Sequence, residues 1–408
     1  MERKQLYARV TVVTLWVVVV AVALTLSVIR FNDAVSGLAV LGIDLRTFVD
    51  AADHARAGRS VYEAPEYTYL PFLAWILLLF PDFDAAIVPW TAASIASAWG
   101  AVTATVVALR GALKGWRAPL VWGLGLVTIM YNQVTVIQQW LGQTDFFLML
   151  LLALAVLLAS FRQSALSGVA LALAALLKTW PAMIGLWLLR RGAPRRAWSV
   201  VAAVATGAVG LLVVALVSGP ATLVEAFEKS LVISRLDLVP FSVWGIGGHL
   251  FTDSGNIEPL VEAPVLGAII SWALAIGVIA LIALILWRPG DDSLSMWNLV
   301  AAVTLLLPLS HLSYRLLVLP LLWVWAAHAL SDRRRWTSVV MVALLGLFWV
   351  VTFRLTPVNE VGGSSPWHYL LVMAVGIAAI AASVLAAARR TPQVSSSATQ
   401  ASDPAAVA

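Results

Sequence analysis

The chain has 408 residues, of which 61% are hydrophobic and only 12% are charged. Soluble domains average roughly 45–50% apolar and about 25% charged residues. One water-soluble core cannot use so much apolar surface, so the sequence predicts an all-α, polytopic membrane protein. This excludes a soluble enzyme, a nucleic-acid-binding domain, a disordered chain and an outer-membrane barrel with strands of roughly ten residues. The absence of cysteine excludes disulfides, thiolate catalysis and cysteine-bound metals.

Apolar segments of spanning length follow one another along most of the chain. The first follows MERKQLYARV and has no A-x-A cleavage pattern after it, so we expect a retained span and not a signal peptide. Residues 164–190 are predicted to form two short helices broken around Lys178 and Pro181, and residues 69–81 are a candidate re-entrant segment. The expected total is roughly 11–13 spans. The segments are 10–30, 86–110, 118–137, 141–161, 196–218, 263–287, 336–353 and 367–388, with shorter ones at 294–310 and 315–331.

The placement of charges predicts the orientation of the spans. Basic residues gather in alternate loops, which the positive-inside rule assigns to the cytoplasm. The two long loops of the other face, residues 31–68 and 219–262, carry acidic residues and are expected outside. The basic residues of the cytoplasmic loops are Arg3, Lys4, Arg9, Arg110, Lys114, Arg117, Arg162, Arg190, Arg191, Arg195, Arg196, Arg288, Arg333, Arg334, Arg335, Arg389 and Arg390.

The domain organisation follows from the same pattern. Residues 1–390 are expected to form a single transmembrane domain, and the small, polar tail 391–408 is expected to be disordered in the cytoplasm. The sequence contains no nucleotide-binding glycine loop and no Walker motif. Because nucleotide sugars and ATP are not available outside the cell, a substrate used at the outer face is expected to be carried on a lipid.

Asp44 in the first outer loop is the leading candidate for a general base. It lies about fourteen residues after the first span, in an apolar stretch, where a carboxylate can accept a proton from an incoming hydroxyl. The helical spacing of Asp44, Phe48 and Ala51 predicts a surface-lying helix over residues 44–57. The alternative is that Asp44 is a helix cap or a solvated loop acid. The polar face of this helix is assigned to Asp50, Asp53, His54 and Arg56.

Lys178 stands between apolar residues in LALAALLKTWPAMIGLWLL. An unpaired lysine at depth costs roughly 2.5–3.5 kcal/mol, which makes it a functional candidate. Beside a helix broken by Pro181 it can hold a lipid phosphate as a point charge. The alternative is a lysine that reaches the cytoplasmic interface. Gln143 and Asp145 lie in an outer loop, WLGQTDFF, where Asp145 is either a site residue or a helix cap.

Three further candidates lie in two later segments that are expected at the outer face. In LLLPLSHLSYRLLVLP, His311 can act as a base or orient one, and Arg315 can bind phosphate through two hydrogen bonds. The alternative for His311 is a loop residue without a role. His249 lies among glycines in SVWGIGGHLF, a pattern that suits a flexible loop closing over a ligand.

With these residues collected, the chain resembles glycosyltransferase family 87 of the GT-C superfamily over roughly residues 40–325. IDLRTFVDAADHARAGRSVYE resembles the family's first-loop pattern, with Asp44 at the acidic position and Gly58 and Tyr62 also fitting. YTYLPF resembles the Y-P-P segment, although Leu70 replaces the first proline. GQTDFFLMLLL resembles the G-Q-x-N helix start, with Asp145 in place of Asn.

The remaining motifs occur in the family's order. LLKTWPAMIGLWLLRR resembles the K-x-x-P segment, and VPFSVWGIGGHL resembles the N-Q-S-x-x-G loop, keeping Ser242 and Gly245. PLSHLSYRLLVLP resembles the S-P-x-S-W-x-H-H segment, with the histidine displaced to position 311 and the later pair missing. The set of motifs, more than any one of them, carries the resemblance.

The resemblance implies a GT-C-type bundle in the cell membrane with its active site on the extracytoplasmic face. Actinobacterial members transfer mannose from polyprenyl-phosphate mannose, here to a hydroxyl of a phosphatidylinositol-mannoside-type glycolipid or lipoglycan, with inversion. No cofactor and no metal is required, although the acidic first loop does not exclude a metal. The implied roles are general base for Asp44, base or partner of the base for His311, phosphate binding for Lys178 and Arg315, and sugar or acceptor binding for Tyr69, Gln143, Asp145 and His249.

Three other functions are compatible with parts of the pattern. A transporter or flippase of a lipid-linked sugar would also use an intramembrane lysine and outer acids, but the long outer loops and the absence of inverted repeats disfavour it. A GT-C enzyme with a lipid-linked arabinofuranose donor differs only in the sugar. A non-catalytic scaffold is disfavoured by Lys178 and by the polar groups clustered at the outer face.

Overall fold

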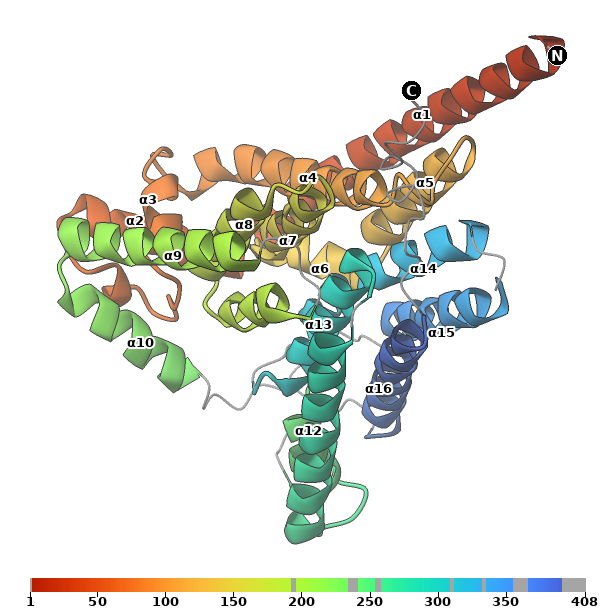
Figure 1. Ribbon diagram of the computed structural model, residues 1–408. Helices are drawn as coiled ribbons and strands as arrows, with labels where there is room; N and C mark the ends of the chain where they lie inside the picture. Colours follow the sequence, from red (N-terminus) through yellow and green to blue (C-terminus); the bar gives the residue numbers. More distant parts are fainter. Residues whose placement is uncertain are drawn as a thin grey trace, which may run out of the picture.

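The computed structural model describes residues 2–191, 196–233, 241–253, 258–288, 290–308, 312–331, 335–354 and 366–390. Every regular element in these ranges is a helix (Figure 1). This confirms the predicted all-α fold class. The predicted disordered tail, residues 391–408, lies outside the described residues, and so does His311.

The helices follow the apolar segments of the sequence in order. The N-terminal half contains α1 (Glu2–Val40), α2 (Ile43–Arg56), η1 (Val61–Glu63), α3 (Phe72–Leu77), α4 (Phe83–Ala108), α5 (Arg117–Met130), α6 (Gln133–Leu141), α7 (Asp145–Ser160), α8 (Ser164–Leu177) and η2 (Trp180–Leu189). The C-terminal half contains α9 (Arg196–Ser218), α10 (Ala221–Ile233), α11 (Val243–Leu250), α12 (Pro264–Trp287), α13 (Asp292–Leu306), η3 (Leu312–Val318), α14 (Leu319–Ser331), α15 (Arg335–Arg354) and α16 (Pro366–Ala388).

Six segments of the described chain are long and apolar enough to cross a membrane. They are Gln5–Val40, Phe83–Ala108, Ala197–Ser218, Pro264–Trp287, Tyr314–Ser331 and Pro366–Ala388. The bent pair α5 and α6 makes a seventh if it is one span, and shorter apolar helices such as α7, α8 and α13 accompany them. The chain is therefore a multi-pass membrane protein, and the number of 11–13 spans stays a prediction.

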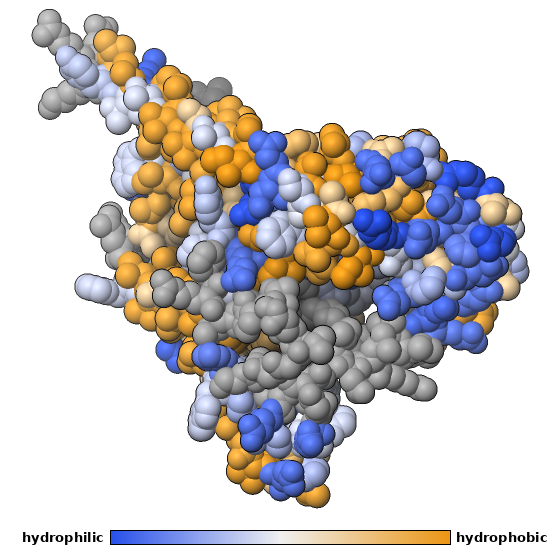
Figure 2. Space-filling model, turned by 180° about the vertical axis from the view of Figure 1, so that it is seen from behind, coloured by the Kyte–Doolittle hydropathy of each residue, from blue (hydrophilic) through white to orange (hydrophobic). Residues whose placement is uncertain are grey.

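Two of the long apolar helices, α1 and α9, expose most of their apolar side chains at the surface of the protein. Only 6% of the most apolar windows of Gln5–Val40 and Ala197–Ser218 are buried inside the protein, as expected for helices that lie against lipid. Hydrophilic residues gather at the end of the molecule where α2 and α3 lie (Figures 1 and 2). A small core that includes Leu45, Phe48 and Trp90 fixes this polar end to the helix bundle.

The predicted apolar segment 118–137 contains a break. It divides into α5 and α6, which are bent by 59°. Asn132 lies at the break, and its side chain accepts a hydrogen bond of 2.8 Å from the backbone N–H of Val134. This is an N-cap bond, which makes a new helix start favourable inside an apolar run.

The predicted break in residues 164–190 is confirmed. Lys178 has extended backbone angles between α8 and η2, and Pro181 occupies the first turn of η2, where a missing N–H costs little. The hairpin of α7 and α8 turns at Arg162, so α8 returns to the level at which α7 begins. The 16 residues of α7 rise about 24 Å, which separates the Lys178 end of the hairpin from Arg162.

Candidate active site

Six side chains from five segments of the chain meet at the polar end of the molecule, and we call them the Asp44 cluster. The electrostatic and hydrogen-bond contacts of Asp44 and Lys178 link all of them. The members are Asp44 at the start of α2, Tyr69 before α3, Gln143 and Asp145 at the start of α7, Lys178 after α8, and Tyr314 in η3.

Two glycines place Asp44 in this cluster. Gly42 has a φ of +44° between α1 and α2, and its N–H donates a 3.0 Å hydrogen bond to the Trp140 carbonyl in α6. Gly142 ends α6 with a φ of +82°, and a Cβ there would lie 2.6 Å from the Cβ of Leu45. Positive φ and close approach both require glycine. The start of α2 therefore packs directly against the turn that carries Gln143.

Asp44 is half-buried, and burial raises its pKa to about 6. The nearby charge of Lys178 and a hydrogen bond from the Gln143 amide lower this pKa, whereas Asp145 and Glu66 raise it. A carboxylate with this pKa is mostly ionised at neutral pH and yet more basic than an ordinary aspartate. Those are the properties of an effective general base.

Lys178 forms the buried ion pair of the cluster. Its Nζ donates a 2.9 Å hydrogen bond to Oδ1 of Asp145, which is fully buried, while the lysine side chain is 12% exposed. The Tyr314 hydroxyl is a second hydrogen-bond partner, and Nζ lies 4.5 Å from the centre of the Tyr314 ring and 5.8 Å from that of Tyr69. The ammonium is held inside the protein at the end of the hairpin opposite Arg162. If the loop at Arg162 is cytoplasmic, as the charge pattern predicts, Lys178 does not reach the cytoplasmic interface.

Asp145 does not cap α7. Thr144 occupies the N-cap position without a side-chain capping bond, and Asp145 is the first helical residue. A carboxylate at this end of a helix is stabilised by the helix dipole and here also by Lys178. The alternative of a helix cap is therefore wrong, since the carboxylate serves the ion pair.

The loop between α2 and α3 positions Tyr69. The Tyr62 hydroxyl donates a 2.9 Å hydrogen bond to the Tyr69 carbonyl, and the Tyr69 ring packs edge-on against Phe48 at 5.0 Å. Phe48 is one helical turn after Asp44, so one buried face of α2 supports both residues. The polar face of α2 carries an ion pair between Arg56 and Asp53 instead, and Nδ1 of His54 lies 3.5 Å from Oε2 of Glu63.

Arg315 and His249 lie in a second group, the Arg315 cluster, with Thr304 and Tyr369. The Arg315 guanidinium is buried and donates a 3.4 Å hydrogen bond to Oγ1 of Thr304. Tyr369 interacts with Arg315 electrostatically, and its ring packs against His249 at 5.4 Å. Because Tyr314 and Arg315 are consecutive in η3, the two clusters adjoin.

The expectation of a flexible glycine loop around His249 is wrong. His249 lies buried in the last turn of α11, and burial lowers its pKa below the ordinary value. Ser242 caps this helix by accepting a 3.4 Å hydrogen bond from the Gly245 N–H. A Cβ on Gly247 would lie 2.3 Å from the Gly267 carbonyl oxygen in α12, so this glycine permits close helix packing.

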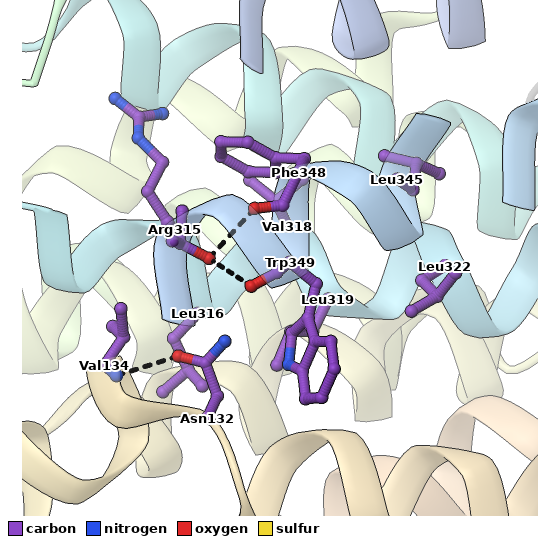
Figure 3. A pocket seen from close by; sticks show the side chains of 11 residues that line it. Asn132, Val134, Arg315, Leu316, Val318, Leu319, Leu322, Leu345, Phe348 and Trp349 are labelled. Atoms are coloured by element: carbon purple, nitrogen blue, oxygen red, sulfur yellow. Dashed lines mark hydrogen bonds between the residues drawn. The ribbon is translucent and has the colours of Figure 1, made fainter. Parts of the chain in front are cut away.

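A mostly apolar pocket lies beside η3 (Figure 3). It is lined by residues of α6, η3, α14 and α15, among them Val134, Leu316 and Phe348. Of its polar lining residues, Asn132 and Thr352 form hydrogen bonds with backbone groups, and Arg315 is the charged one. In Figure 3 the guanidinium of Arg315 points away from Asn132.

Some members of the site cannot be recognised from the sequence. Tyr314 and Glu66 stand in no sequence pattern that predicts the contact of Tyr314 with Lys178 or that of Glu66 with Asp44. Among the residues that the structure describes, no three His, Asp or Glu side chains lie together in a way that could hold a metal ion.

One family model matches more than half of the chain. It is described as glycosyltransferase family 87, and it covers residues 67–310. No curated protein matches the chain. The matched range contains Tyr69, Gln143, Asp145, Lys178 and His249, whereas Asp44 precedes it and Arg315 follows it. Together with the helical membrane fold, this match shows that the chain belongs to glycosyltransferase family 87 and is a membrane glycosyltransferase.

Proposed function

We propose that the protein transfers mannose from polyprenyl-phosphate mannose to a hydroxyl of a phosphatidylinositol-mannoside-type glycolipid or lipoglycan. The reaction takes place at the extracytoplasmic face of the cell membrane and inverts the anomeric configuration. The observation that supports this proposal most is the position of Asp44. It is a half-buried base beside a buried lysine, at the polar end of a protein of this family.

Asp44 is the general base of the proposed reaction. The acceptor hydroxyl oxygen attacks the anomeric carbon and forms the new glycosidic bond while the bond from that carbon to the phosphate oxygen breaks. The hydroxyl proton passes to the Asp44 carboxylate, and polyprenyl phosphate leaves with the bonding electrons. His311 is the proposed partner of Asp44, or the base itself if Asp44 only orients the acceptor.

The leaving phosphate needs cations that are in place before the reaction. An ammonium has three N–H donors, and Asp145 and Tyr314 are two hydrogen-bond partners of Lys178. One donor can therefore reach a phosphate oxygen. Because Asp145 already offsets the lysine charge, a second cation is needed. Arg315 follows Tyr314 directly in η3 and takes that role in the proposal.

The proposed roles of the remaining candidates follow their positions. Tyr69, Gln143 and Asp145 belong to the Asp44 cluster and are assigned to the sugar or the acceptor. His249 belongs to the Arg315 cluster, where its ring packs against Tyr369. A neutral, buried imidazole there can donate a hydrogen bond to a ligand hydroxyl or accept one from it.

A transfer assay with two donors tests the proposal. The purified protein in nanodiscs receives polyprenyl-phosphate [14C]mannose or polyprenyl-phosphate [14C]arabinofuranose, together with phosphatidylinositol mannosides and lipomannan. We expect a labelled glycolipid from the mannose donor. Label transferred only from the arabinofuranose donor would overturn the choice of sugar. Movement of a labelled donor across a proteoliposome membrane, without a new glycosidic bond, would favour the flippase.

A further inference from the structure

Buried polar atoms without hydrogen-bond partners concentrate in one short segment, which runs from α6 into the start of α7. More than half of the buried side-chain atoms that lack a partner among the described residues lie between Thr135 and Asp145. They are Thr135 Oγ1, Gln138 Oε1 and Nε2, Gln139 Oε1 and Nε2, Gln143 Oε1, Thr144 Oγ1 and Asp145 Oδ2. We call Thr135, Gln138 and Gln139 the α6 polar face.

Burial of the α6 polar face lowers the stability of the unliganded protein. Thr135 and Gln138 are fully buried, and Gln139 is 5% exposed. Buried polar groups are nearly always hydrogen-bonded, and an unpaired one costs the free energy of its desolvation. Both atoms of each amide are affected here, so the cost is repeated along one helix. An apolar side chain of similar size at these positions would avoid it, which indicates that a ligand pairs with these groups.

The α6 polar face lies near the groups that are proposed to take part in the reaction. The Gln143 N–H donates a 2.9 Å hydrogen bond to the Gln138 carbonyl, so Gln138 lies one helical turn from the residue that contacts Asp44. At the other end of α6, Val134 lines the pocket beside Arg315 (Figure 3). Helix α6 therefore extends from the neighbourhood of Asp44, the proposed general base, to that of Arg315, the second proposed phosphate-binding cation.

The chemistry of the face fits a sugar ring. An amide offers an acceptor oxygen and two donor hydrogens in one plane, and a threonine hydroxyl both donates and accepts. Neighbouring hydroxyls of a sugar need partners of both kinds. A sugar that is transferred from a phosphate to an acceptor must lie between the phosphate-binding cations and the base, if the attacking and leaving oxygens are in line.

We propose that Thr135, Gln138 and Gln139 bind the hydroxyl groups of the sugar that the polyprenyl phosphate carries. This inference rests on the proposed function and deepens it, because it assigns recognition of the donor sugar to α6. These residues form no covalent bond with the donor during the reaction. They hold the ring in position and make binding of the donor depend on its hydroxyls.

A role in sugar binding predicts opposite effects of one substitution on the stability of the protein and on its affinity for the donor. Gln138→Met keeps the length of the side chain and removes the unpaired amide, so the unliganded protein should unfold at the same temperature or a higher one. Binding of the sugar should weaken, because its hydroxyls lose their partners. A glutamine that served packing alone would give the opposite result, namely a lower unfolding temperature.

The test compares two lipids on three proteins in nanodiscs. The proteins are the wild type, Gln138→Met and the control Gln163→Met, whose glutamine is exposed at the other end of the α7–α8 hairpin. The probes are polyprenyl-phosphate mannose and polyprenyl phosphate without a sugar. We expect Gln138→Met to weaken binding of the mannose lipid by about tenfold and to leave binding of the bare phosphate unchanged. Gln163→Met should match the wild type for both lipids.

Three results would overturn the inference. The first is a Gln138→Met protein that binds both lipids like the wild type. In that case the polar side chains of α6 would be hydrated and would take no part in binding the sugar. The second is a lower unfolding temperature with equal loss of both lipids. The third is a wild type that binds the mannose lipid no more tightly than the bare phosphate.

A second variant and the transfer assay complete the test. Gln139→Met repeats the test at a second position if Gln138→Met does not fold. A wild type that fails to transfer mannose contradicts the proposed function alone, because the difference in binding between the two lipids still tests the α6 polar face.

Discussion

The ionisation of Asp44 sets the pH dependence of the proposed reaction. Burial raises the pKa of this carboxyl to about 6, and a general base acts only when it is deprotonated. The value of kcat/KM should therefore rise with pH through about 6 and level off above about 7. A pH profile of transfer in nanodiscs checks this. A rate that stays constant down to about pH 4, near the ordinary pKa of aspartate, would contradict it.

The buried ion pair makes a separate prediction at the residue scale. Asp145→Asn leaves the Lys178 ammonium buried without its counter-ion, which should destabilise the protein by about 3–5 kcal/mol. The double variant Asp145→Leu with Lys178→Met removes both charges and should recover most of that stability without recovering transfer. Unfolding in detergent and transfer rates measure the two effects. Recovery of transfer in the double variant would exclude Lys178 from phosphate binding.

Individual residues could be predicted where their chemistry conflicts with their surroundings. Lys178 stood out as a charge among apolar residues, and the structure places it in a buried pair. Asp145 was predicted as a site residue or a cap, and only the contact with Lys178 decides between the two. Gln138 and Gln139 could not be recognised, because a sequence does not show whether a buried amide finds a partner.

At the scale of elements, the packing of α2 on α6 depends on Gly142. Alanine there would need an unfavourable positive φ, and its Cβ would lie 2.6 Å from the Leu45 Cβ. Gly142→Ala should cost roughly 1–3 kcal/mol of stability and reduce transfer, because α2 carries Asp44. Gly111→Ala is the control, since a Cβ there meets nothing within 4 Å. Equal activity of the two variants would show that the position of α2 does not matter.

The existence of the helices could be predicted better than their breaks. Long apolar runs predicted α1, α4, α9, α12, α15 and α16 within a few residues at most ends, apart from the longer α1. The bend between α5 and α6 could not be predicted from hydropathy, because it depends on one capping bond of Asn132. The glycines of α11 suggested a loop, whereas Gly247 serves close packing against α12 and Ser242 starts the helix.

For the whole molecule, the orientation in the membrane is a prediction that the absence of cysteine makes simple to test. Asp50 in α2 and Lys114 between α4 and α5 are both exposed. Asp50→Cys should react with a membrane-impermeant maleimide added to intact cells, and Lys114→Cys should react only in inverted vesicles. Each variant is the control for the other. The reverse pattern would place the Asp44 cluster on the cytoplasmic face.

The class of the molecule could be predicted from composition, because apolar content and charge placement are properties of the whole chain. The arrangement of the site could not. The Asp44 cluster joins residues from α2 to η3, and only tertiary packing brings Lys178 to Asp145 and Tyr314. The family motifs predicted several members of the site, whereas the division into an Asp44 cluster and an Arg315 cluster required the structure.

The most direct test of the account compares two aspartates of the same helix. Asp44→Asn keeps the shape of the side chain and a hydrogen-bond acceptor but cannot take a proton. Asp50→Asn makes the same change at an exposed position of α2. With polyprenyl-phosphate [14C]mannose as donor, Asp50→Asn should transfer label like the wild type, and Asp44→Asn should lose at least about 100-fold in rate without loss of folding. A folded Asp44→Asn protein with wild-type transfer would contradict the assignment of Asp44 as the general base.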